Sequence, residues 1–370
     1  MRPVAPELLV NPGRRHDGSV ARSEVRSAQL HRRFPGYAPT RVVDAPALAA
    51  ELGLASLSVK DESRRLGLPS FKILGASWAV YRLLVDRLGH EPEWRDIDDL
   101  RAALAPLGHL TLVAATDGNH GRAVAHMARL LGYESRILVP AGTASARVDA
   151  IEGEGASVTV VDGTYDDAVR ASAALAADDV LVVSDTSWEG YTEVPRTVIE
   201  GYATIFAEID EQLAAAPEVV VVPMGVGALA AATVQHYASH ATIIVVEPLS
   251  AACGLHSAAA GRPVAVPGPH DSIMAGLNCG MVSIIAWPAV SAGVDLFVAV
   301  DDTAAEQAMR DLATIGVVAG ETGAAALAGL RAALAAGAAG APDLRGRRVL
   351  VLCTEGATDP VAYRRIVGEP

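Results

Sequence analysis

The lysines are the residues with the most distinctive chemistry in this chain. Of its 30 Lys and Arg residues only two are lysines, Lys60 and Lys72. Arg suffices wherever only a surface cation is needed, but forming an imine with an aldehyde requires an amine. Lys60 lies in SVKDES beside two acidic residues, which favours a paired structural cation, whereas Lys72 in SFKILGAS (70–77) precedes a helical pattern. Lys72 is therefore the candidate for amine chemistry, unless the two lysines are retained by chance.

An aspartate stands in a turn that is otherwise suited to binding an anion. Asp117 belongs to TDGNHG (116–121), which lies between the apolar run HLTLVAA and the helical pattern AVAHMARLLG. The N–H groups at the start of a helix attract anions, so a carboxylate there either caps the helix or acts on a bound molecule. Asp185 in SDTSWEG also follows an apolar run and is either an ordinary strand-end carboxylate or a site residue.

The glycine-rich segment PMGVGALAAA (223–232) follows the apolar run EVVVV and allows three interpretations. Gly225, Gly227 and Ala230 match G-x-G-x-x-A, and Glu247 closes the next strand-like run, which is typical of a nicotinamide-dinucleotide site. The same backbone could form a cup for a single phosphate at a helix start. The third interpretation is a tight turn between a strand and a helix.

Strand-like runs alternate with helical patterns along most of the chain, which predicts an α/β fold of mostly parallel sheets covered by helices on both faces. With 370 residues the chain is long enough for two domains, and the helical pattern 192–216 would connect one α/β unit to the next. Tyr165 in GTYDDAV would begin a helix that Thr164 and Asp167 cap. The first forty residues would wrap over the surface or over an oligomer partner. In such sheets ligands collect at the carboxyl ends of the strands, where the segments 70–77, 116–121 and 223–232 would lie. The predicted strands include 56–59, 109–115, 135–139, 157–161, 180–184, 218–222, 242–247 and 348–353.

The composition excludes several classes of function. The formal net charge is -13 and no basic stripe is present, so nucleic-acid binding is not expected. Neither a signal peptide nor a membrane-spanning run is visible, so we expect a cytoplasmic protein without a membrane partner. The three cysteines have no metal-ligand spacing and no metal site is predicted, although Cys253 and Cys279 could pair if the fold brings them together.

Lys72 and the turn at 116–121 decide between the interpretations of the glycine-rich segment. A dinucleotide site explains neither of them. Pyridoxal 5'-phosphate, in contrast, needs an amine for its aldehyde, a cup for its phosphate and donors around its ring oxygen. Lys72 would supply the amine and Asn119 a donor, and the cup would consist of Gly225, Val226, Gly227, Ala228 and Leu229.

Several motifs resemble those of a known family. Four of them are similar to motifs of the pyridoxal phosphate enzymes of the tryptophan synthase β fold type (fold type II), which include threonine and serine dehydratases. These four are SFKILGAS, TDGNHG, PMGVGALA and CTEGATDP. Further motifs resemble the diaminopropionate ammonia-lyase family in particular. They are FPGYAPTRV, VKDES, TDGNHGRAVA, YDDAVR, SDTSWEGY and IMAGLNCG. The similarity extends from about residue 34 to residue 365. Pro69, Ser70 and Ala76 depart from the family pattern and bear on fine substrate preference.

The resemblance implies a fold and an oligomeric state. A large cofactor-binding domain would comprise residues 1–70 and 206–370, and a small mobile domain would comprise residues 71–205. Each domain would be a mostly parallel twisted sheet flanked by helices, and two chains would form a homodimer. Lys72 would hold the cofactor through an imine and would act as a base at the substrate Cα once displaced, and Phe71 would also bind the cofactor.

The same resemblance assigns roles around the substrate. Thr354 in CTEG would offer a neutral hydroxyl group to the pyridine nitrogen of the cofactor. Asp117 would act at the face opposite Lys72 and so serve the D-isomer, and Asp185 would be its companion near the β-ammonium group. The loop that grips the substrate carboxylate would consist of Thr116, Gly118, Asn119 and His120.

The reaction implied is α,β-elimination of ammonia from 2,3-diaminopropionate, in its D or L form, which gives pyruvate and two molecules of ammonia. A serine or threonine dehydratase of the same fold is a second candidate. Asp117 and Asp185 discriminate, because a neutral hydroxyl leaving group does not need paired carboxylates to hold an ammonium group. An NAD-dependent dehydrogenase could be built on the glycine-rich segment. A non-catalytic amino-acid-binding protein is the fourth candidate, and the retention of Lys72 argues against it.

Overall fold

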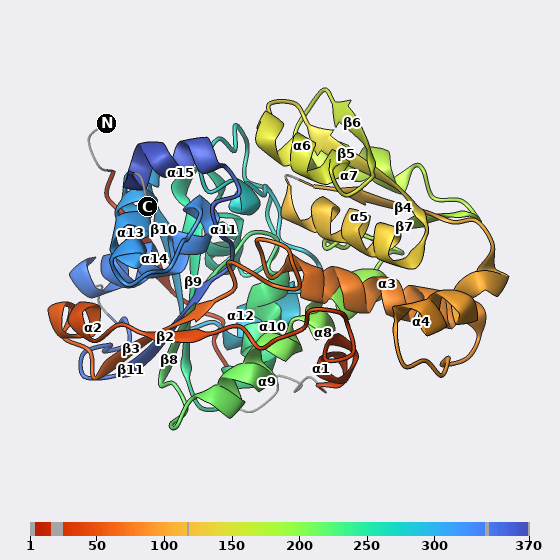
Figure 1. The fold of residues 1–370 in the computed structure, drawn as a ribbon. Coiled ribbons are helices and arrows are strands. Elements are labelled where there is room, and N and C mark those ends of the chain that lie inside the picture. The colour runs from red at the N-terminus through yellow and green to blue at the C-terminus, as the bar shows by residue number, and fades with distance from the viewer. Residues whose placement is uncertain (1–3, 16–24, 117, 337–339, 369–370) are drawn as a thin grey trace. The chain divides into compact units, whose positions relative to one another are not determined.

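The chain folds into two compact units, and most of their helices and strands are labelled in Figure 1. The computed structural model describes residues 4–15, 25–116, 118–336 and 340–368. The large unit contains the described parts of Met1–Glu24, Pro39–Arg64 and Ile205–Pro370. The small unit contains Val25–Ala38 and Arg65–Thr204.

The small unit differs in extent from the predicted small domain, 71–205. It also contains residues 25–38 and 65–70, which the sequence assigned to the large domain. The buried ring of His31 explains part of the difference, because its Nδ1 atom is hydrogen-bonded to Thr204 Oγ1 at 2.7 Å. A polar contact between residues so far apart in the chain leaves no periodic pattern in the sequence.

The large unit is built on a sheet of seven strands among the described residues, in the order β1-β10-β9-β8-β11-β3-β2. The inner strands pair in parallel, whereas the edge strands β1 and β2 are antiparallel to their neighbours. Its strands are β1 (Glu7–Val10), β2 (Val42–Asp44), β3 (Ser56–Asp61), β8 (Val219–Pro223), β9 (Thr242–Pro248), β10 (Leu296–Val300) and β11 (Arg348–Cys353). Its helices are α2 (Pro46–Leu52), α9 (Ala203–Gln212), which begins at the unit boundary, α10 (Ala228–Tyr237), α11 (Cys253–Ala260), α12 (Trp287–Gly293), α13 (Asp302–Thr314), α14 (Glu321–Ala336) and α15 (Pro360–Val367), with short 3-10 turns η2 (Leu249–Ala251) and η3 (Ala275–Leu277).

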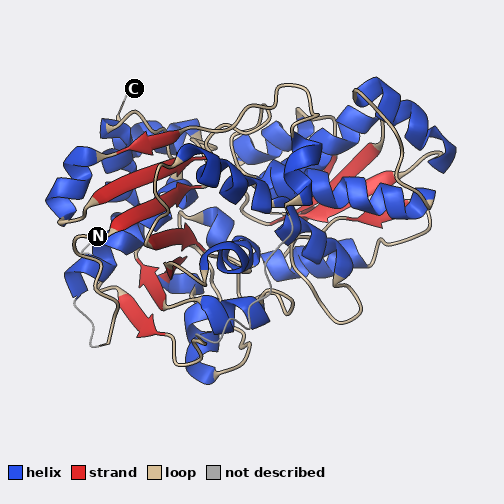
Figure 2. Cartoon of the chain, turned by 90° about the horizontal axis from the view of Figure 1, so that it is seen from below, coloured by secondary structure: helices blue, strands red, loops and turns tan. Residues whose placement is uncertain are grey.

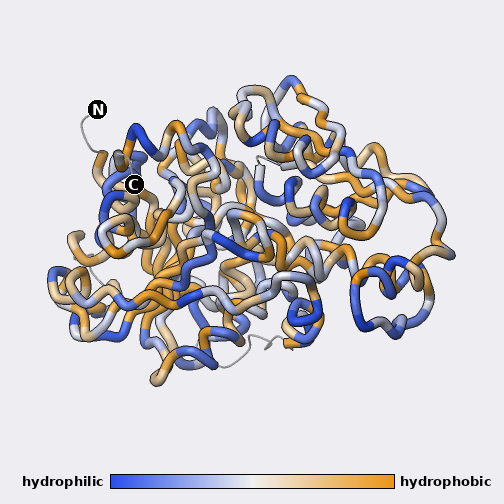
Figure 3. The backbone as a smooth tube through the Cα atoms, in the orientation of Figure 1, coloured by the Kyte–Doolittle hydropathy of each residue, from blue (hydrophilic) through white to orange (hydrophobic). Residues whose placement is uncertain are grey.

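The inner strands β8 and β10 of this sheet are continuous apolar runs, as expected where helices cover both faces (Figure 2). All residues of β8 are buried. Val219 and Val221 belong to a core cluster that includes Leu327 of α14, so Val220 and Val222 point to the opposite face. Figure 3 shows the resulting concentration of hydrophobic residues along the strands. The predicted α/β fold with mostly parallel sheets is confirmed.

The small unit has a parallel sheet of four strands among the described residues, in the order β6-β5-β4-β7. Its strands are β4 (Thr111–Ala115), β5 (Glu134–Pro140), β6 (Ser157–Val161) and β7 (Val180–Val182). Its helices are α1 (Arg26–His31), α3 (Lys72–Leu88), α4 (Ile97–Leu104), α5 (Asn119–Leu131), α6 (Ser145–Glu152), α7 (Tyr165–Ala173) and α8 (Glu193–Gly201), with the 3-10 turn η1 (Ala105–Leu107). No helix of the described chain is long and apolar enough to cross a membrane.

The helical pattern predicted over 192–216 forms two helices, α8 and α9, separated at Tyr202. Close packing against α3 accompanies the break. A Cβ atom added to Gly201 would lie only 2.5 Å from the carbonyl oxygen of Leu74, so the chain approaches the backbone of α3 as only glycine permits.

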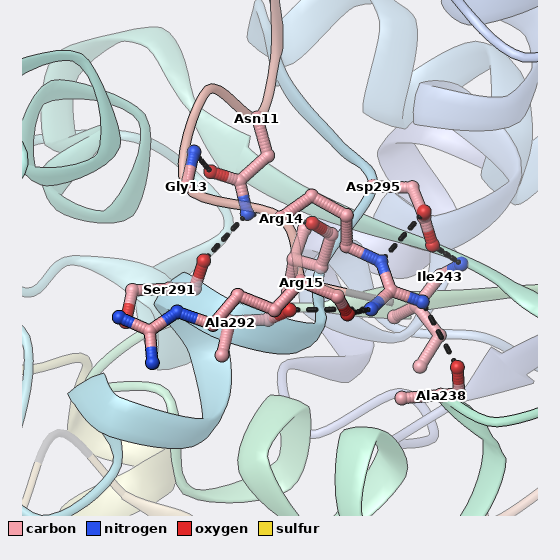
Figure 4. A network of polar contacts seen from close by, with 10 residues as sticks. Asn11, Gly13, Arg14, Arg15, Ala238, Ile243, Ser291, Ala292 and Asp295 are labelled. Atoms are coloured by element: carbon pink, nitrogen blue, oxygen red, sulfur yellow. Dashed lines mark hydrogen bonds and ion pairs between the residues drawn. The ribbon is translucent and has the colours of Figure 1, made fainter. Parts of the chain in front are cut away.

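The N-terminal segment 4–15 completes one edge of the large sheet, where the sequence predicts a surface wrap. Its strand β1 pairs with β10, and the turn that follows is held by side-chain contacts (Figure 4). Asn11 Nδ2 donates to the carbonyl oxygen of Ser291 at 2.9 Å. The guanidinium group of Arg14 lies 2.8 Å from Asp295 Oδ1, and both side chains are largely buried. The segment is therefore a structural part of the sheet.

Candidate active site

A lysine and a buried aspartate form the centre of the site in the small unit. Lys72 is the first residue of α3, and its Nζ atom lies 2.6 Å from Asp185 Oδ2. Asp185 follows β7 and is only 4% exposed. Burial by itself would raise the pKa of Asp185, but the positive charge of Lys72 and its hydrogen bond outweigh burial and hold the pKa well below its usual range. The carboxylate is therefore charged at neutral pH and binds a primary ammonium group.

Tyr165 and His120 complete the surroundings of the Asp185 carboxylate. The Tyr165 hydroxyl donates to Asp185 Oδ1 at 3.1 Å. His120 Nδ1 lies 3.9 Å from Asp185 Oδ2, and its Nε2 atom is 2.8 Å from the carbonyl oxygen of Val183. Burial lowers the pKa of His120, so the neutral ring donates through Nε2 to Val183. The positive charge that faces the carboxylate at neutral pH therefore comes from Lys72, and Tyr165 and His120 are neutral.

Tyr165 is a site residue that was not predicted from the sequence. Its predicted place at a capped helix start is confirmed, because Thr164 and Asp167 form a capping box at the start of α7. Its hydroxyl group nevertheless reaches Asp185, which lies 20 residues further along the chain. The motif YDDAVR, which resembles that of a known family, was the signal that could have pointed to it.

Phe71, which is predicted to bind the cofactor, packs beside Lys72. It precedes the first residue of α3 and is buried, and its ring centroid lies 5.6 Å from Lys72 Nζ. The ring of Tyr202 also packs on Phe71, with 4.7 Å between the two ring centroids. Aromatic surface therefore lies beside the Lys72 amine, and the Lys72 side chain is 20% exposed.

The turn TDGNHG connects β4 to α5, as its sequence predicts. Buried Thr116 ends the strand side and accepts a hydrogen bond from the Gly118 N–H through Oγ1 at 2.8 Å. Gly118 has a φ of 153°, which favours glycine, and α5 begins at Asn119. The first N–H groups of such a helix have no acceptor within it and are suited to a carboxylate. Asp117, for which the resemblance implies a catalytic role, lies outside the described residues.

The glycine-rich segment in the large unit has the geometry of a phosphate cup. It connects β8 to α10, and Gly227, with a φ of 97°, adopts the left-handed conformation at the helix start. A Cβ atom on Gly225 would lie 3.1 Å from Cys279 Sγ and 3.1 Å from the carbonyl oxygen of Gly276. A side chain at Gly225 would therefore crowd its neighbours, and the backbone N–H groups at the start of α10 are suited to an anion. The cup includes the buried residues Val226, Ala228 and Leu229.

Glu247 has a structural role that argues against a dinucleotide site. Its carboxylate is fully buried and accepts hydrogen bonds from the N–H groups of Gly254 at 2.7 Å and Leu255 at 2.9 Å. Both oxygens therefore serve the start of α11 instead of facing a ribose. Burial raises the pKa of Glu247 to about 7. The dehydrogenase interpretation loses the acidic residue on which it depends.

Thr354 offers a hydroxyl group that the rest of the described chain does not use. It follows β11, is 2% exposed, and its Oγ1 atom has no hydrogen-bond partner among the described residues. A buried hydroxyl without a partner is costly unless a bound molecule supplies one. A neutral hydroxyl, an anion cup and a lysine amine are together the set that pyridoxal phosphate requires, so the residues present fit this cofactor.

The second lysine is a structural cation, as predicted, and its contacts include residues far from it in the sequence. Lys60 is fully buried, and its Nζ atom lies 2.8 Å from Glu208 Oε2, 2.8 Å from the carbonyl oxygen of Thr40 and 2.9 Å from Gln212 Oε1. An amine enclosed in this way cannot reach an aldehyde. Lys72 is thus the lysine available for imine chemistry.

The cysteines are all buried and free in this structure. Cys253 Sγ lies 3.6 Å from the carbonyl oxygen of Gly225, and Cys279 Sγ would touch a side chain at the same glycine. The fold therefore brings both sulfur atoms to the phosphate cup, as free thiols. No group of three or more His, Cys, Asp or Glu residues in the described part of the chain is arranged to hold a metal ion.

Comparisons with known proteins identify the family. A family model described as "Pyridoxal-phosphate dependent enzyme" matches residues 33–355. Diaminopropionate ammonia-lyase of Escherichia coli (strain K12) is 36% identical over 363 residues, covering 92% of this chain and 90% of that protein. The crystal structure of the Escherichia coli enzyme in complex with D-serine has a TM-score of 0.89 and 33% identity, and the match covers 98% of this chain and 96% of that one. A biosynthetic L-threonine dehydratase of Mycobacterium leprae (strain TN) is 35% identical, but over only 59% of this chain and 52% of that protein. The chain belongs to the pyridoxal-phosphate dependent enzymes, and within that family it groups with the diaminopropionate ammonia-lyases.

Proposed function

We propose that this protein catalyses the α,β-elimination of ammonia from 2,3-diaminopropionate, which yields pyruvate and two molecules of ammonia. The observation that carries the proposal is the contact of 2.6 Å between Lys72 Nζ and the buried Asp185 carboxylate. Lys72 presents a primary ammonium group there, which is the same chemical group as the β-ammonium of the substrate. A pocket that is built to hold such a cation suits diaminopropionate better than it suits serine, whose leaving group is neutral.

Bound pyridoxal phosphate supplies an electron-withdrawing ring that makes the proton on the substrate Cα easier to remove. Lys72 would hold the cofactor aldehyde, with Phe71 against it and Asn119 as a donor to the ring oxygen. The segment Gly225–Leu229 would hold the phosphate. Thr354 would face the pyridine nitrogen, and its neutral hydroxyl favours elimination because it limits electron withdrawal into the ring.

The chain's own residues account for the proton transfers. As a free amine, Lys72 is a base that removes the Cα proton from one face of the substrate. The β-nitrogen must leave as ammonia, because amide ion is too basic to depart. Asp185, kept ionised, holds the β-nitrogen in its protonated form, and the Tyr165 hydroxyl fixes the orientation of the carboxylate.

The turn at 116–121 would hold the other end of the substrate. Thr116, Gly118 and His120 belong to a helix start that suits the substrate carboxylate. For Asp117 we retain the role that the resemblance implies, which is removal of the Cα proton from the D-isomer at the face opposite Lys72. The substitution Asp117→Asn is then expected to depress turnover of D-diaminopropionate far more than that of the L-isomer, and equal losses would contradict this role.

The homodimer, the cytoplasmic location and the mobility of the small domain stay predictions. The resemblance to the family supports the dimer and the mobility. Size-exclusion chromatography with light scattering at several protein concentrations tests the oligomeric state directly.

The substitution Asp185→Asn tests the proposed substrate. The neutral amide keeps the shape but cannot neutralise an ammonium group. We expect kcat/KM for diaminopropionate to fall at least ~100-fold, since a buried charge pair loses one partner, and kcat/KM for serine to fall less than ~10-fold. Pyruvate release measures both. Asp178→Asn, at an exposed aspartate in the turn before β7, is the matched control and should change neither value.

A serine or threonine dehydratase is the second candidate function, and this experiment addresses it. A wild-type protein that releases pyruvate from serine or threonine faster than from diaminopropionate would favour the dehydratase and overturn the proposal. Equal losses on both substrates in Asp185→Asn would also contradict the assignment, because Asp185 would then act in a step that is common to both.

A further inference from the structure

A tyrosine closes the loop that carries Asp185. We propose that Tyr191 is a positioning residue, which acts through Asp185 and sets the preference for an ammonium leaving group. The inference rests on the proposed function of Asp185. The contacts that support it lie within the small unit.

The Tyr191 hydroxyl bridges two backbone groups on either side of the end of β7. It donates to the carbonyl oxygen of Val182 at 2.7 Å and accepts from the N–H group of Ser184 at 3.1 Å. Ser184 is buried and directly precedes Asp185 in the chain. Burial raises the pKa of Tyr191 far above its usual range, so the hydroxyl stays a donor at every physiological pH.

The ring of Tyr191 is itself held rigidly. Trp188 stacks on it with a centroid distance of 4.2 Å and an interplanar angle of 10°. The two residues also exchange backbone hydrogen bonds, from Trp188 N to Tyr191 O at 3.3 Å and from Tyr191 N to Trp188 O at 3.0 Å. The segment 184–191 therefore folds back on itself, and the Tyr191 hydroxyl lies at the end of β7.

The Tyr191 hydroxyl limits the positions that the Asp185 carboxylate can take. The sheet holds the chain up to Val183, whose N–H donates to Val113 of β4 at 2.7 Å. Beyond that point the chain leaves the sheet, and the N–H of Ser184 is held by Tyr191 instead of by a neighbouring strand. Without the hydroxyl, the carbonyl oxygen of Val182 and the N–H group of Ser184 each lose a hydrogen-bond partner. The peptide group before Asp185 can then rotate toward another hydrogen-bond partner.

A carboxylate that must hold an ammonium group is sensitive to such a rotation. A charge-assisted hydrogen bond depends on the position of both oxygens, and Asp185 uses Oδ2 for the ammonium and Oδ1 for Tyr165. A neutral leaving group makes no such demand. Loss of the Tyr191 hydroxyl should therefore lower the elimination of ammonia selectively.

The substitution Tyr191→Phe isolates this effect. It keeps the ring, the stack on Trp188 and the shape of the adjacent cavity of about 360 Å³, which Tyr191 lines together with Leu83 and Val194. Tyr133→Phe is a matched control in the same unit, because the Tyr133 hydroxyl makes one long contact of 3.5 Å with the carbonyl oxygen of Leu104.

Kinetics of the holoenzyme and of a double variant form the first part of the test. We expect Tyr191→Phe to lower kcat/KM for diaminopropionate about tenfold and kcat/KM for serine less than about twofold, and to cause no further loss when combined with Asp185→Asn. Equal losses on both substrates, or losses that multiply with those of Asp185→Asn, would overturn the proposal. Tyr133→Phe should leave both values at the wild-type level.

Hydrogen–deuterium exchange on cofactor-free protein forms the second part and does not depend on activity. The peptide that contains Ser184 should exchange faster in Tyr191→Phe than in wild type or Tyr133→Phe, and unchanged exchange would refute the positioning role. If Asp185→Asn affects both substrates equally while this peptide exchanges faster, the proposed function fails and Tyr191 still positions the loop. If Asp185→Asn is selective and Tyr191→Phe is not, the inference alone fails.

Discussion

The buried carboxyl group of Glu247 should make the stability of the large unit depend on pH. Burial is the main cause that raises its pKa from the ordinary 4.5 to about 7, and the hydrogen bonds from Gly254 and Leu255 offset burial only in part. The unfolded chain releases this proton near pH 4.5, whereas the folded protein keeps it up to about pH 7. Between these values the folded state binds more protons, so the free energy of unfolding falls as the pH rises.

The gap between the two pKa values of Glu247 corresponds to about 3 kcal/mol. Glu247→Gln removes the charge and keeps the shape, but it gives up one of the two backbone hydrogen bonds, at a cost of about 1 kcal/mol. We therefore expect the variant to exceed wild type in free energy of unfolding by about 2 kcal/mol near pH 8 and to show no gain near pH 5.

Urea denaturation of the cofactor-free protein between about pH 5 and pH 8, followed by circular dichroism, measures the effect of Glu247→Gln. Glu7→Gln is the control, because Glu7 is exposed on β1 of the same unit and should change the stability at neither pH. A Glu247→Gln variant that follows wild type at every pH would refute the reasoning, because the carboxyl group would then titrate alike in the folded and unfolded states.

Three further predictions concern the cofactor and the N-terminal segment. Borohydride should bleach the yellow holoenzyme and fix the cofactor to Lys72, and peptide mapping that found it on buried Lys60 would contradict the assignment. Gly225→Ala should weaken pyridoxal phosphate binding roughly tenfold in a fluorescence titration, because the new Cβ atom crowds the cup, and wild-type affinity would argue against the cup. Asp295→Asn should lower the free energy of unfolding by about 1 kcal/mol in thermal denaturation and leave kcat unchanged, since it weakens the buried pair with Arg14, which has a structural role. A loss of activity without a loss of stability would contradict this purely structural role.

Features that depend on local sequence could be predicted. The strand–turn–helix geometry of Gly225 and of the turn before Asn119 follows from apolar runs, glycines and helical periodicity that lie within about twenty residues of one another. The scarcity of lysine indicated Lys72 without any knowledge of the fold. The two acidic residues beside Lys60 in the sequence indicated a structural cation, although its partner Glu208 lies 148 residues away and was not predicted.

Features that depend on distant contacts could not be predicted. Tyr165 joins the site because the start of α7 and the end of β7 meet in space, and its sequence shows only a helix cap. The break at Tyr202 arises where Gly201 touches the backbone of α3. The short edge strand β1 has only four residues and lacks a clear alternation, so its pairing with β10 is visible only in three dimensions.

The strand order of the large sheet has a consequence for how the protein is made. β11 (Arg348–Cys353) lies between β8 and β3, so the segment that is synthesised after the other described strands of this sheet fills its middle. The strands of the small unit, in contrast, all lie between residues 111 and 182 and can pair while the ribosome is still translating. Until residue 353 emerges, the apolar strands β3 and β8 each keep an unpaired edge. The nascent large unit is therefore most exposed to misassociation before β11 is made, at the open edges of β3 and β8, and β8 is the strand that leads into the glycine-rich segment.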